Sequence, residues 1–315
     1  MSRSLPSMSA ALAAVAVLVT ALAPAASAQP SARVTDPGIA VHFDVSSGQQ
    51  PENIALADNG SVDLTLSFAR QVVRVTADGR TQVLGTVPPP PAGTAVPLTG
   101  NAFVSGLVHG PDGALYFLYS AGSADLNGLW RLCPGEAPHR IAALPADGVP
   151  NGLALYGGYF YATDSAKATV WRIPLTGGTA TTWSTGPVLA TKPGTFGANG
   201  IKVHNGAVWV TNLGEGTLIR IPLDAHGTAR VVASGLGPVD DFTFTGADNT
   251  ILAAVNPANQ VLRIRPDGTH EVLLSAADGL QNPTAVAVRG RQVYVTDSAY
   301  FTGTDPNLLV ARLDR

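Results

Sequence analysis

Residues 150–155 read PNGLAL, and this string decides the fold because five strings of the same form recur along the chain. The others are PENIAL (51–56), VSGLVH (104–109), ANGIKV (198–203), VDDFTF (239–244) and PTAVAV (283–288). In each string the second residue has a side-chain oxygen, and the residues after it continue as a strand-like run. Successive second residues are 41 to 53 positions apart. A repeat of this length predicts a propeller or a solenoid.

Each string starts a unit of three or four strand-like runs, which are rich in Val, Ile, Thr and Tyr. The third run of every unit contains one arginine: Arg74, Arg131, Arg172, Arg220, Arg263 and Arg312. One residue type at the same place in every unit is typical of a repeat-building residue, with a packed stem and a head at the surface. We therefore assign these arginines to the architecture rather than to a functional site.

Five units continue into a fourth run, whereas the last unit ends at Arg315 without one. The unassigned run IAVHFDV (39–45) can take the missing place beside residues 308–314, which leaves no open edge. A solenoid would instead need a capping repeat at each end of the array, and the sequence contains no such repeat. We predict an all-β fold: a six-bladed β-propeller with four strands per blade, its last blade closed by the N-terminal strand.

The composition excludes several classes of function. Only 13% of the residues are charged and the net charge is −3, so we expect neither a nucleic acid nor an anionic membrane as a partner. Cys133 is the only cysteine, which excludes an internal disulfide. The histidines form no cluster with the spacing of metal ligands. We expect a monomer that acts on a small molecule.

The first 28 residues are typical of a secretory leader. Arg3 supplies the charge, residues 10–22 the apolar stretch, and residues 26–28 (ASA) a small-residue cleavage site. The alternative is an uncleaved membrane anchor, but the apolar stretch is short for a membrane span. We predict a signal peptide at 1–28 and the propeller at 29–315. The protein would then be secreted or periplasmic, with no membrane attachment after cleavage.

In a closed ring, the first strands of the blades surround the axis, and their second residues meet at one mouth of the channel. Glu52, Asn151, Asn199 and Asp240 then bring two carboxylates and two amide oxygens to one point. Donors of this kind suit calcium, or magnesium or manganese, better than softer metals. The alternative is that Asn-Gly and Asp are ordinary turn residues here. Residue types that differ while the register stays fixed favour a divalent-cation site, with calcium as the first choice.

Four further positions belong to this prediction. Asp241 and Asn53 each follow one of the two carboxylates in the sequence, and either could add a ligand or hydrogen-bond one. Ser105 and Thr284 hold the same register as the ligands but are weak ligands themselves. We therefore place Ser105 and Thr284 at the rim of the channel.

The strings PENIAL, PNGLAL, ANGIKV and VDDFTF, with the runs YATDS and VWVTN, resemble the calcium-dependent six-bladed propeller hydrolases. These are the gluconolactonase and senescence-marker-protein family, with the paraoxonases and diisopropyl-fluorophosphatase as cousins. The resemblance implies that Glu52, Asn151, Asn199 and Asp240 hold a catalytic metal. Ser105 departs from the paraoxonase pattern, which has a histidine there, and the second-blade asparagine of many sugar lactonases is absent.

These observations predict a secreted, divalent-metal-dependent lactonase or esterase with its metal in the central channel. The metal would polarise the scissile carbonyl, and Asp240 would act as general base or nucleophile. Phe196, Tyr300 and Phe301 fall on loops that can face the same mouth and are candidates for substrate contact. Two alternatives stay open: a propeller that binds a ligand or protein without catalysis, and a lyase on the same scaffold.

Overall fold

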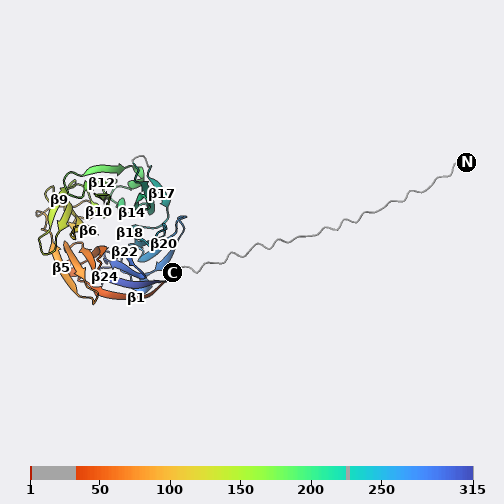
Figure 1. Cartoon of the computed structure of the whole chain (residues 1–315), viewed down its shortest axis with the longest axis horizontal. Coiled ribbons are helices and arrows are strands. Elements are labelled where there is room, and N and C mark those ends of the chain that lie inside the picture. The colour runs from red at the N-terminus through yellow and green to blue at the C-terminus, as the bar shows by residue number, and fades with distance from the viewer. Residues whose placement is uncertain (2–32, 225–227, 315) are drawn as a thin grey trace. The chain divides into compact units, whose positions relative to one another are not determined.

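The structure is a computed structural model that describes residue 1, residues 33–224 and residues 228–314. Residues 2–28 of the predicted signal peptide lie outside these ranges. Six antiparallel four-stranded sheets form a ring around a central axis (Figure 1), so the predicted six-bladed propeller is confirmed. Within the described ranges, no helix is long and apolar enough to span a membrane.

The first three blades each contain four consecutive strands. Blade one has β2 (Pro51–Leu56), β3 (Val62–Leu66), β4 (Gln71–Val75) and β5 (Thr81–Thr86). Blade two has β6 (Phe103–His109), β7 (Leu115–Ser120), β8 (Gly128–Leu132) and β9 (His139–Ala143). Blade three has β10 (Pro150–Tyr156), β11 (Tyr159–Asp164), β12 (Thr169–Pro174) and β13 (Thr181–Thr185).

The last three blades follow the same order until the chain ends. Blade four has β14 (Ala198–His204), β15 (Ala207–Asn212), β16 (Thr217–Pro222) and β17 (Arg230–Ala233). Blade five has β18 (Val239–Phe244), β19 (Ile251–Val255), β20 (Gln260–Ile264) and β21 (His270–Leu274). Blade six has β22 (Pro283–Arg289), β23 (Gln292–Asp297), β24 (Asn307–Asp314) and, outermost, β1 (Arg33–His42). Short 3-10 turns lie at η1 (Val45–Ser47), η2 (Pro187–Leu189) and η3 (Ala276–Asp278).

The two ends of the chain close the ring, as predicted. β1 pairs antiparallel with β24, so that Arg33 lies opposite Asp314 and His42 opposite Asn307. The predicted bounds of this strand, 39–45, are wrong at both ends. The strand begins six residues earlier, at Arg33, and stops at His42 because Asp44 caps η1 by accepting a hydrogen bond from the Ser46 amide.

The innermost strand of every blade has a β-bulge near its start. The register of pairing shifts at this point between β2 and β3, and the same shift occurs in the five other blades. The shifts enclose the six predicted positions: Glu52, Ser105, Asn151, Asn199, Asp240 and Thr284. Bulges re-aim side chains next to functional sites. Asn-Gly and Asp therefore stand inside bulged strands and not in turns.

The glycines that follow Ser105 and Asn151 have a packing reason. A Cβ on Gly152 would lie 2.4 Å from the Asn199 carbonyl oxygen, and one on Gly106 would lie 2.6 Å from the Asn151 carbonyl oxygen. Both atoms belong to the innermost strand of the next blade. The bulged strands thus approach each other too closely for a side chain at these two places.

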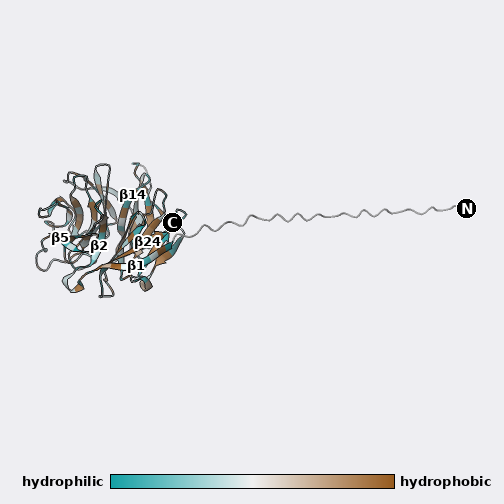
Figure 2. Cartoon of the chain, turned by 60° about the horizontal axis from the view of Figure 1, so that its bottom comes forward, coloured by the Kyte–Doolittle hydropathy of each residue, from teal (hydrophilic) through white to brown (hydrophobic). Residues whose placement is uncertain are grey.

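Hydrophobic side chains fill the spaces between neighbouring sheets, and Figure 2 shows hydrophobic residues along the strands. Between blades two and three, Leu118 and Phe160 are fully buried in one cluster. Between blades four and five, Trp209 and Phe242 are buried in another. Each such side chain stabilises the fold by about 1.5–3 kcal/mol. The ring is therefore held by apolar contacts between blades, with the axis left for polar side chains.

The six arginines of the third strands contact their own blade, as predicted for repeat-building residues. Arg74 donates two hydrogen bonds to the buried carboxylate of Asp63 on β3. Arg172 and Arg220 lie over the rings of Tyr159 and Trp209. None of the six lines the cavity that is described below.

Candidate metal centre

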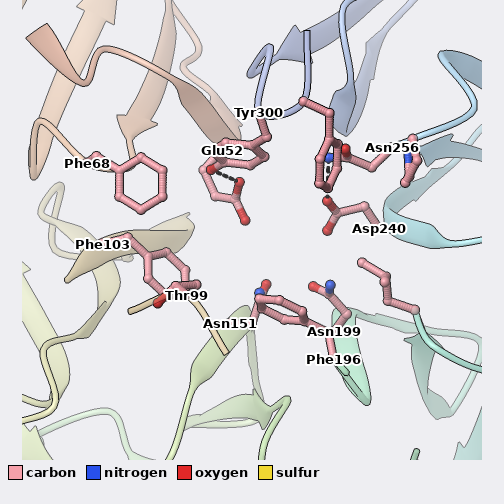
Figure 3. A pocket seen from close by; sticks show the side chains of 13 residues that line it. Glu52, Phe68, Thr99, Phe103, Asn151, Phe196, Asn199, Asp240, Asn256 and Tyr300 are labelled. Carbon is pink, nitrogen blue, oxygen red and sulfur yellow. Dashed lines mark hydrogen bonds between the residues drawn. The ribbon is translucent and has the colours of Figure 1, made fainter. Parts of the chain in front are cut away.

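The four predicted ligands line one cavity at one end of the axis (Figure 3). Glu52, Asn151, Asn199 and Asp240 come from blades one, three, four and five, and all four side chains are buried. In Figure 3 they point toward a common space. The cavity has a volume of about 270 Å³, so a single small molecule fits inside it.

Tyr300 fixes the carboxylate of Glu52. Its hydroxyl donates a hydrogen bond of 2.6 Å to Oε2 of Glu52, across the junction between blades six and one. Burial raises the pKa of Glu52 to about 7, the hydrogen bond from Tyr300 opposes that rise, and the charge of Asp241 adds to it. Near neutral pH, Glu52 is therefore only partly ionised, and a positive charge beside it would favour the carboxylate.

Asp240 is the second buried carboxyl group of the cavity. Burial and the neighbouring acids Glu52 and Asp241 raise the pKa of Asp240 well above its ordinary value. Asn256 Nδ2 donates a 3.2 Å hydrogen bond to Asp240 Oδ2, which only partly offsets this rise. Two carboxyl groups placed together in this way are costly to ionise unless a cation lies between them.

Two amide oxygens of the cavity are buried without a hydrogen-bond donor among the described residues. They are Oδ1 of Asn199 and Oδ1 of Asn256. A buried oxygen that finds no donor costs about 1–3 kcal/mol, so an oxygen left in this state calls for a partner. A divalent cation is such a partner, because its ligands are carboxylate and amide oxygens. The residues present fit a hard cation.

Few of the possible metal ligands in the cavity carry a charge. Nowhere in residues 33–224 and 228–314 do three or more His, Cys, Asp or Glu side chains cluster as a metal site. The cavity instead combines two carboxylates with the amides of Asn151, Asn199 and Asn256. This composition excludes the sulfur and imidazole ligands that softer metals prefer and leaves calcium, magnesium or manganese as the matching ions.

Asp241 and Asn53 lie beside the candidate centre but bond to each other. Asn53 Nδ2 donates a 3.0 Å hydrogen bond to Asp241 Oδ2, and Lys202 Nζ lies 2.6 Å from both carboxylate oxygens of Asp241. Asn53 and Lys202 line a second cavity, formed by the far ends of the innermost strands. Asp241 thus forms an ion pair with Lys202, and its negative charge still raises the pKa of Glu52 and of Asp240.

Ser105 and Thr284 do not reach the cavity. Both are fully buried, and their hydroxyls donate to the carbonyl oxygens of Pro150 and Pro51, which belong to the next blades of the ring. The predicted place on the channel rim needs correction, since these side chains join neighbouring blades. The bulge turns a short hydroxyl side chain into the gap between the strands, where a backbone oxygen accepts a hydrogen bond from it.

Asn256 is the residue of the centre that sequence reasoning missed. It follows the second strand of blade five, directly after Val255. A serine holds this place in four other blades: Ser67, Ser120, Ser165 and Ser298. Each of these serines donates to a backbone carbonyl near the axis. An asparagine at residue 256, where four other blades have a serine, is the sequence signal that could have identified Asn256.

Aromatic side chains surround the entrance above the four ligands. Phe196, Tyr300 and Phe301, the predicted candidates for substrate contact, all line the cavity. Phe68 and Phe103 line it too, although the sequence analysis did not single them out. The Phe68 ring lies between those of Phe103 and Tyr300, with centroid distances of 6.4 and 5.7 Å.

Residues 60–243 match the model of a family described as a repeat of unknown function (DUF6923), and this match spans more than half of the chain. The chain belongs to the DUF6923 family. No curated protein sequence matches this DUF6923 chain.

Solved structures share the fold of the DUF6923 chain. A calcium-binding regucalcin from Agrobacterium tumefaciens is 16% identical, with 88% of this chain and 93% of that chain covered and a TM-score of 0.65. A Xanthomonas campestris gluconolactonase is 14% identical (91% and 99% covered, TM-score 0.59). A virginiamycin B lyase from Staphylococcus aureus is 18% identical (84% and 81% covered, TM-score 0.61). At these identities the likeness shows the propeller fold alone.

Proposed function

We propose that this DUF6923 propeller is a divalent-cation-dependent hydrolase that acts on a lactone or an ester. The observation that carries the proposal is the pair of buried carboxyl groups, Glu52 and Asp240, that share one cavity with the unpartnered Oδ1 of Asn199. A purely structural channel has no need for two acids at this depth, because ionising them together costs free energy.

In this proposal Glu52, Asn151 and Asn199 hold the cation, with Asn256 as a further oxygen donor. When bound, the cation supplies a Lewis acid that polarises a carbonyl group and favours the oxyanion formed from it. Two carboxylates neutralise a doubly charged ion, and the amides add ligation without added charge. Calcium is the first choice, since large oxygen-only sites suit it.

Asp240 is the reacting side chain of this proposal. As a carboxylate it takes a proton from the attacking water or itself attacks the carbonyl carbon. Its pKa lies well above the ordinary value in the cation-free protein. A neighbouring positive charge lowers that pKa and leaves Asp240 in the ionised form that either reaction needs.

Structural neighbours include a gluconolactonase and a virginiamycin B lyase, so both reaction classes occur on related propellers. A lyase would need a base on a loop at the mouth of the cavity. The polar side chains that the described loops place there are those of Thr99, Asn256 and Tyr300. The Tyr300 hydroxyl is already bonded to Glu52, and Thr99 donates to the Asn101 carbonyl. This arrangement favours hydrolysis by the acids at the axis.

The test uses the full chain after treatment with a chelator. Calcium, magnesium and manganese are titrated by calorimetry, and a panel of lactones and aryl esters is assayed with and without each ion. We expect cation-dependent turnover that Asp240→Asn lowers by at least about 100-fold, because a general base contributes this much. Asp297→Asn is the matched control: Asp297 is also buried, but it does not line the cavity.

Two results would overturn the proposal that the protein is a hydrolase. One is a panel without any cation-dependent turnover, and the other is an Asp240→Asn variant that stays fully active. In the first case, a calorimetric signal for the cation alone would leave a propeller that binds ligands without catalysis. Circular dichroism would check that Asp240→Asn keeps its fold, and the calorimetric titration would show whether the variant still binds the cation.

A further inference from the structure

We infer that the substrate presents an apolar, aryl or alkyl group to this cavity and not the hydroxyl-rich face of a sugar lactone. This inference rests on the proposed function and names the substrate class of the same site. Its basis is the wall of the cavity above the candidate metal centre, where aromatic rings from blades one, two, four and six meet.

The rings form a continuous surface. Phe103 contacts Phe68 edge to face, and Phe68 contacts Tyr300 in the same way, with interplanar angles of 62° and 64°. Phe196 lines the cavity from the segment before β14, and Figure 3 shows its ring beside Asn151 and Asn199. Rings in such a wall present faces and edges to a ligand, which favours an aromatic or aliphatic group.

The wall offers few free hydrogen-bonding groups. The hydroxyl of Tyr300 is bonded to Glu52, and that of Thr99 is bonded to the carbonyl oxygen of Asn101. Asn256 directs its Nδ2 at Asp240. In the proposed site the cation occupies the unpartnered Oδ1 atoms of Asn199 and Asn256, so most hydroxyls of a sugar lactone would lose their water without gaining a partner. The site therefore selects against polyols.

The outer edge of the cavity is also apolar. The Phe301 side chain lines the mouth and is 73% exposed, which leaves a large apolar ring in water. Leu213 and Pro257 line the cavity from blades four and five. An exposed ring that continues an apolar cavity is typical of a surface that a ligand covers. The apolar group of the substrate thus extends from the centre toward Phe301.

The experiment compares two six-membered lactones that differ in their substituents. One is δ-valerolactone with a phenyl group on the ring carbon next to the ring oxygen, and the other is δ-gluconolactone. Both are assayed with saturating calcium. We expect kcat/KM for the phenyl lactone to be higher by at least about tenfold. Equal rates, or a preference for gluconolactone, would overturn the inference while leaving a hydrolase in place.

Variants locate the effect. Phe301→Ser should lower kcat/KM for the phenyl lactone several-fold and leave gluconolactone unchanged, and its exposed position protects the fold. Tyr156→Ser is the matched control, because Tyr156 is 51% exposed and lines the second cavity, away from the candidate centre. A loss in both variants, or in neither, would contradict an apolar subsite at Phe301.

Measurements of ligand binding test the apolar subsite independently of the proposed hydrolysis. If neither lactone is hydrolysed with any cation, the hydrolase fails, and calorimetry with the two corresponding lactams tests the subsite alone. Binding of the phenyl lactam that Phe301→Ser weakens and Tyr156→Ser retains would uphold the apolar subsite. Binding of the polyol lactam with equal or higher affinity, or no binding of either lactam, would overturn it.

Discussion

The hydroxyl of Tyr300 donates a 2.6 Å hydrogen bond to Oε2 of Glu52, and this contact joins the last blade to the first at the level of the candidate metal centre. The contact occupies one oxygen of the carboxylate and leaves the other for a ligand. It also opposes the effect of burial on the pKa of Glu52. Tyr300 thus belongs to the aromatic wall through its ring and influences the ionisation of Glu52 through its hydroxyl.

Tyr300→Phe should weaken cation binding near neutral pH. The ring stays, but the pKa of Glu52 rises further above about 7, since the hydrogen bond that lowered it is lost. A proton then competes better with the cation, and we expect roughly tenfold lower calcium affinity at about pH 7, recovering at higher pH. Calorimetric titration at two pH values measures this. Tyr294→Phe is the control, because that hydroxyl bonds to Gln292 on an exposed strand end.

The wild-type chain should itself bind calcium more tightly as the pH rises through about 7. Glu52 must lose its proton to act as a ligand, and burial places its pKa at about 7 in the cation-free state. The affinity should therefore increase between about pH 6 and pH 8. An affinity that stays constant over this interval would show that Glu52 is not a ligand.

Asn199→Asp should change affinity and activity in opposite directions. A third carboxylate adds charge at an oxygen that has no donor among the described residues, so the cation binds more tightly. The same charge quenches the Lewis acid and slows turnover. Without a cation, the variant should melt at a lower temperature than the wild type, because three buried acids repel one another. Calorimetry, an activity assay and a thermal melt check the three effects, and tighter binding with faster turnover would contradict the expectation.

Asp297 should make the stability of the fold depend on pH. Burial raises the pKa of this carboxyl from 3.8 to about 8, while the unfolded chain keeps the ordinary value. The folded state therefore holds this proton more tightly than the unfolded chain does. The contribution of Asp297 to the free energy of unfolding falls as the pH rises from about 4 to about 8. Asp297→Asn keeps an oxygen for the Gln281 amide and removes the titration. Above about pH 8 the variant should have a higher melting temperature than the wild type. If the variant keeps the pH dependence of the wild-type melting temperature, Asp297 is not its cause.

Deletion of residues 29–46 should lower the free energy of unfolding by roughly 3 kcal/mol or more. The deletion removes Val34 and Ile39 from a cluster that contains Leu309, and it exposes the edge of β24. A thermal melt and size-exclusion chromatography measure the loss and any association through the open edge. A synthetic peptide of residues 33–42 should restore part of the melting temperature. A truncated chain as stable as the full one would refute closure by β1.

Much of this architecture could be predicted because each innermost strand repeats one register. The positions of Glu52 and Asp240 near the axis follow from that register. The direction of a side chain inside a bulge does not follow from the register. Ser105 and Thr284 were therefore predicted at the rim of the channel, whereas they point between blades. Asn256 and Phe68 come from segments after the second strands, whose approach to the axis depends on how the blades tilt and pack.

The pairing of β1 with β24 also has a consequence for biosynthesis. β24 leaves the ribosome after the other described strands of the ring, so blade six cannot be completed until residues 307–314 emerge. Contacts between the two ends of a chain are slow to form, although the added loop entropy grows only weakly with length. Until then, β1 keeps a free edge that can accept the β24 of another copy. Crowded nascent chains would thus exchange strands and form linked rings, a domain swap that dilution during refolding suppresses.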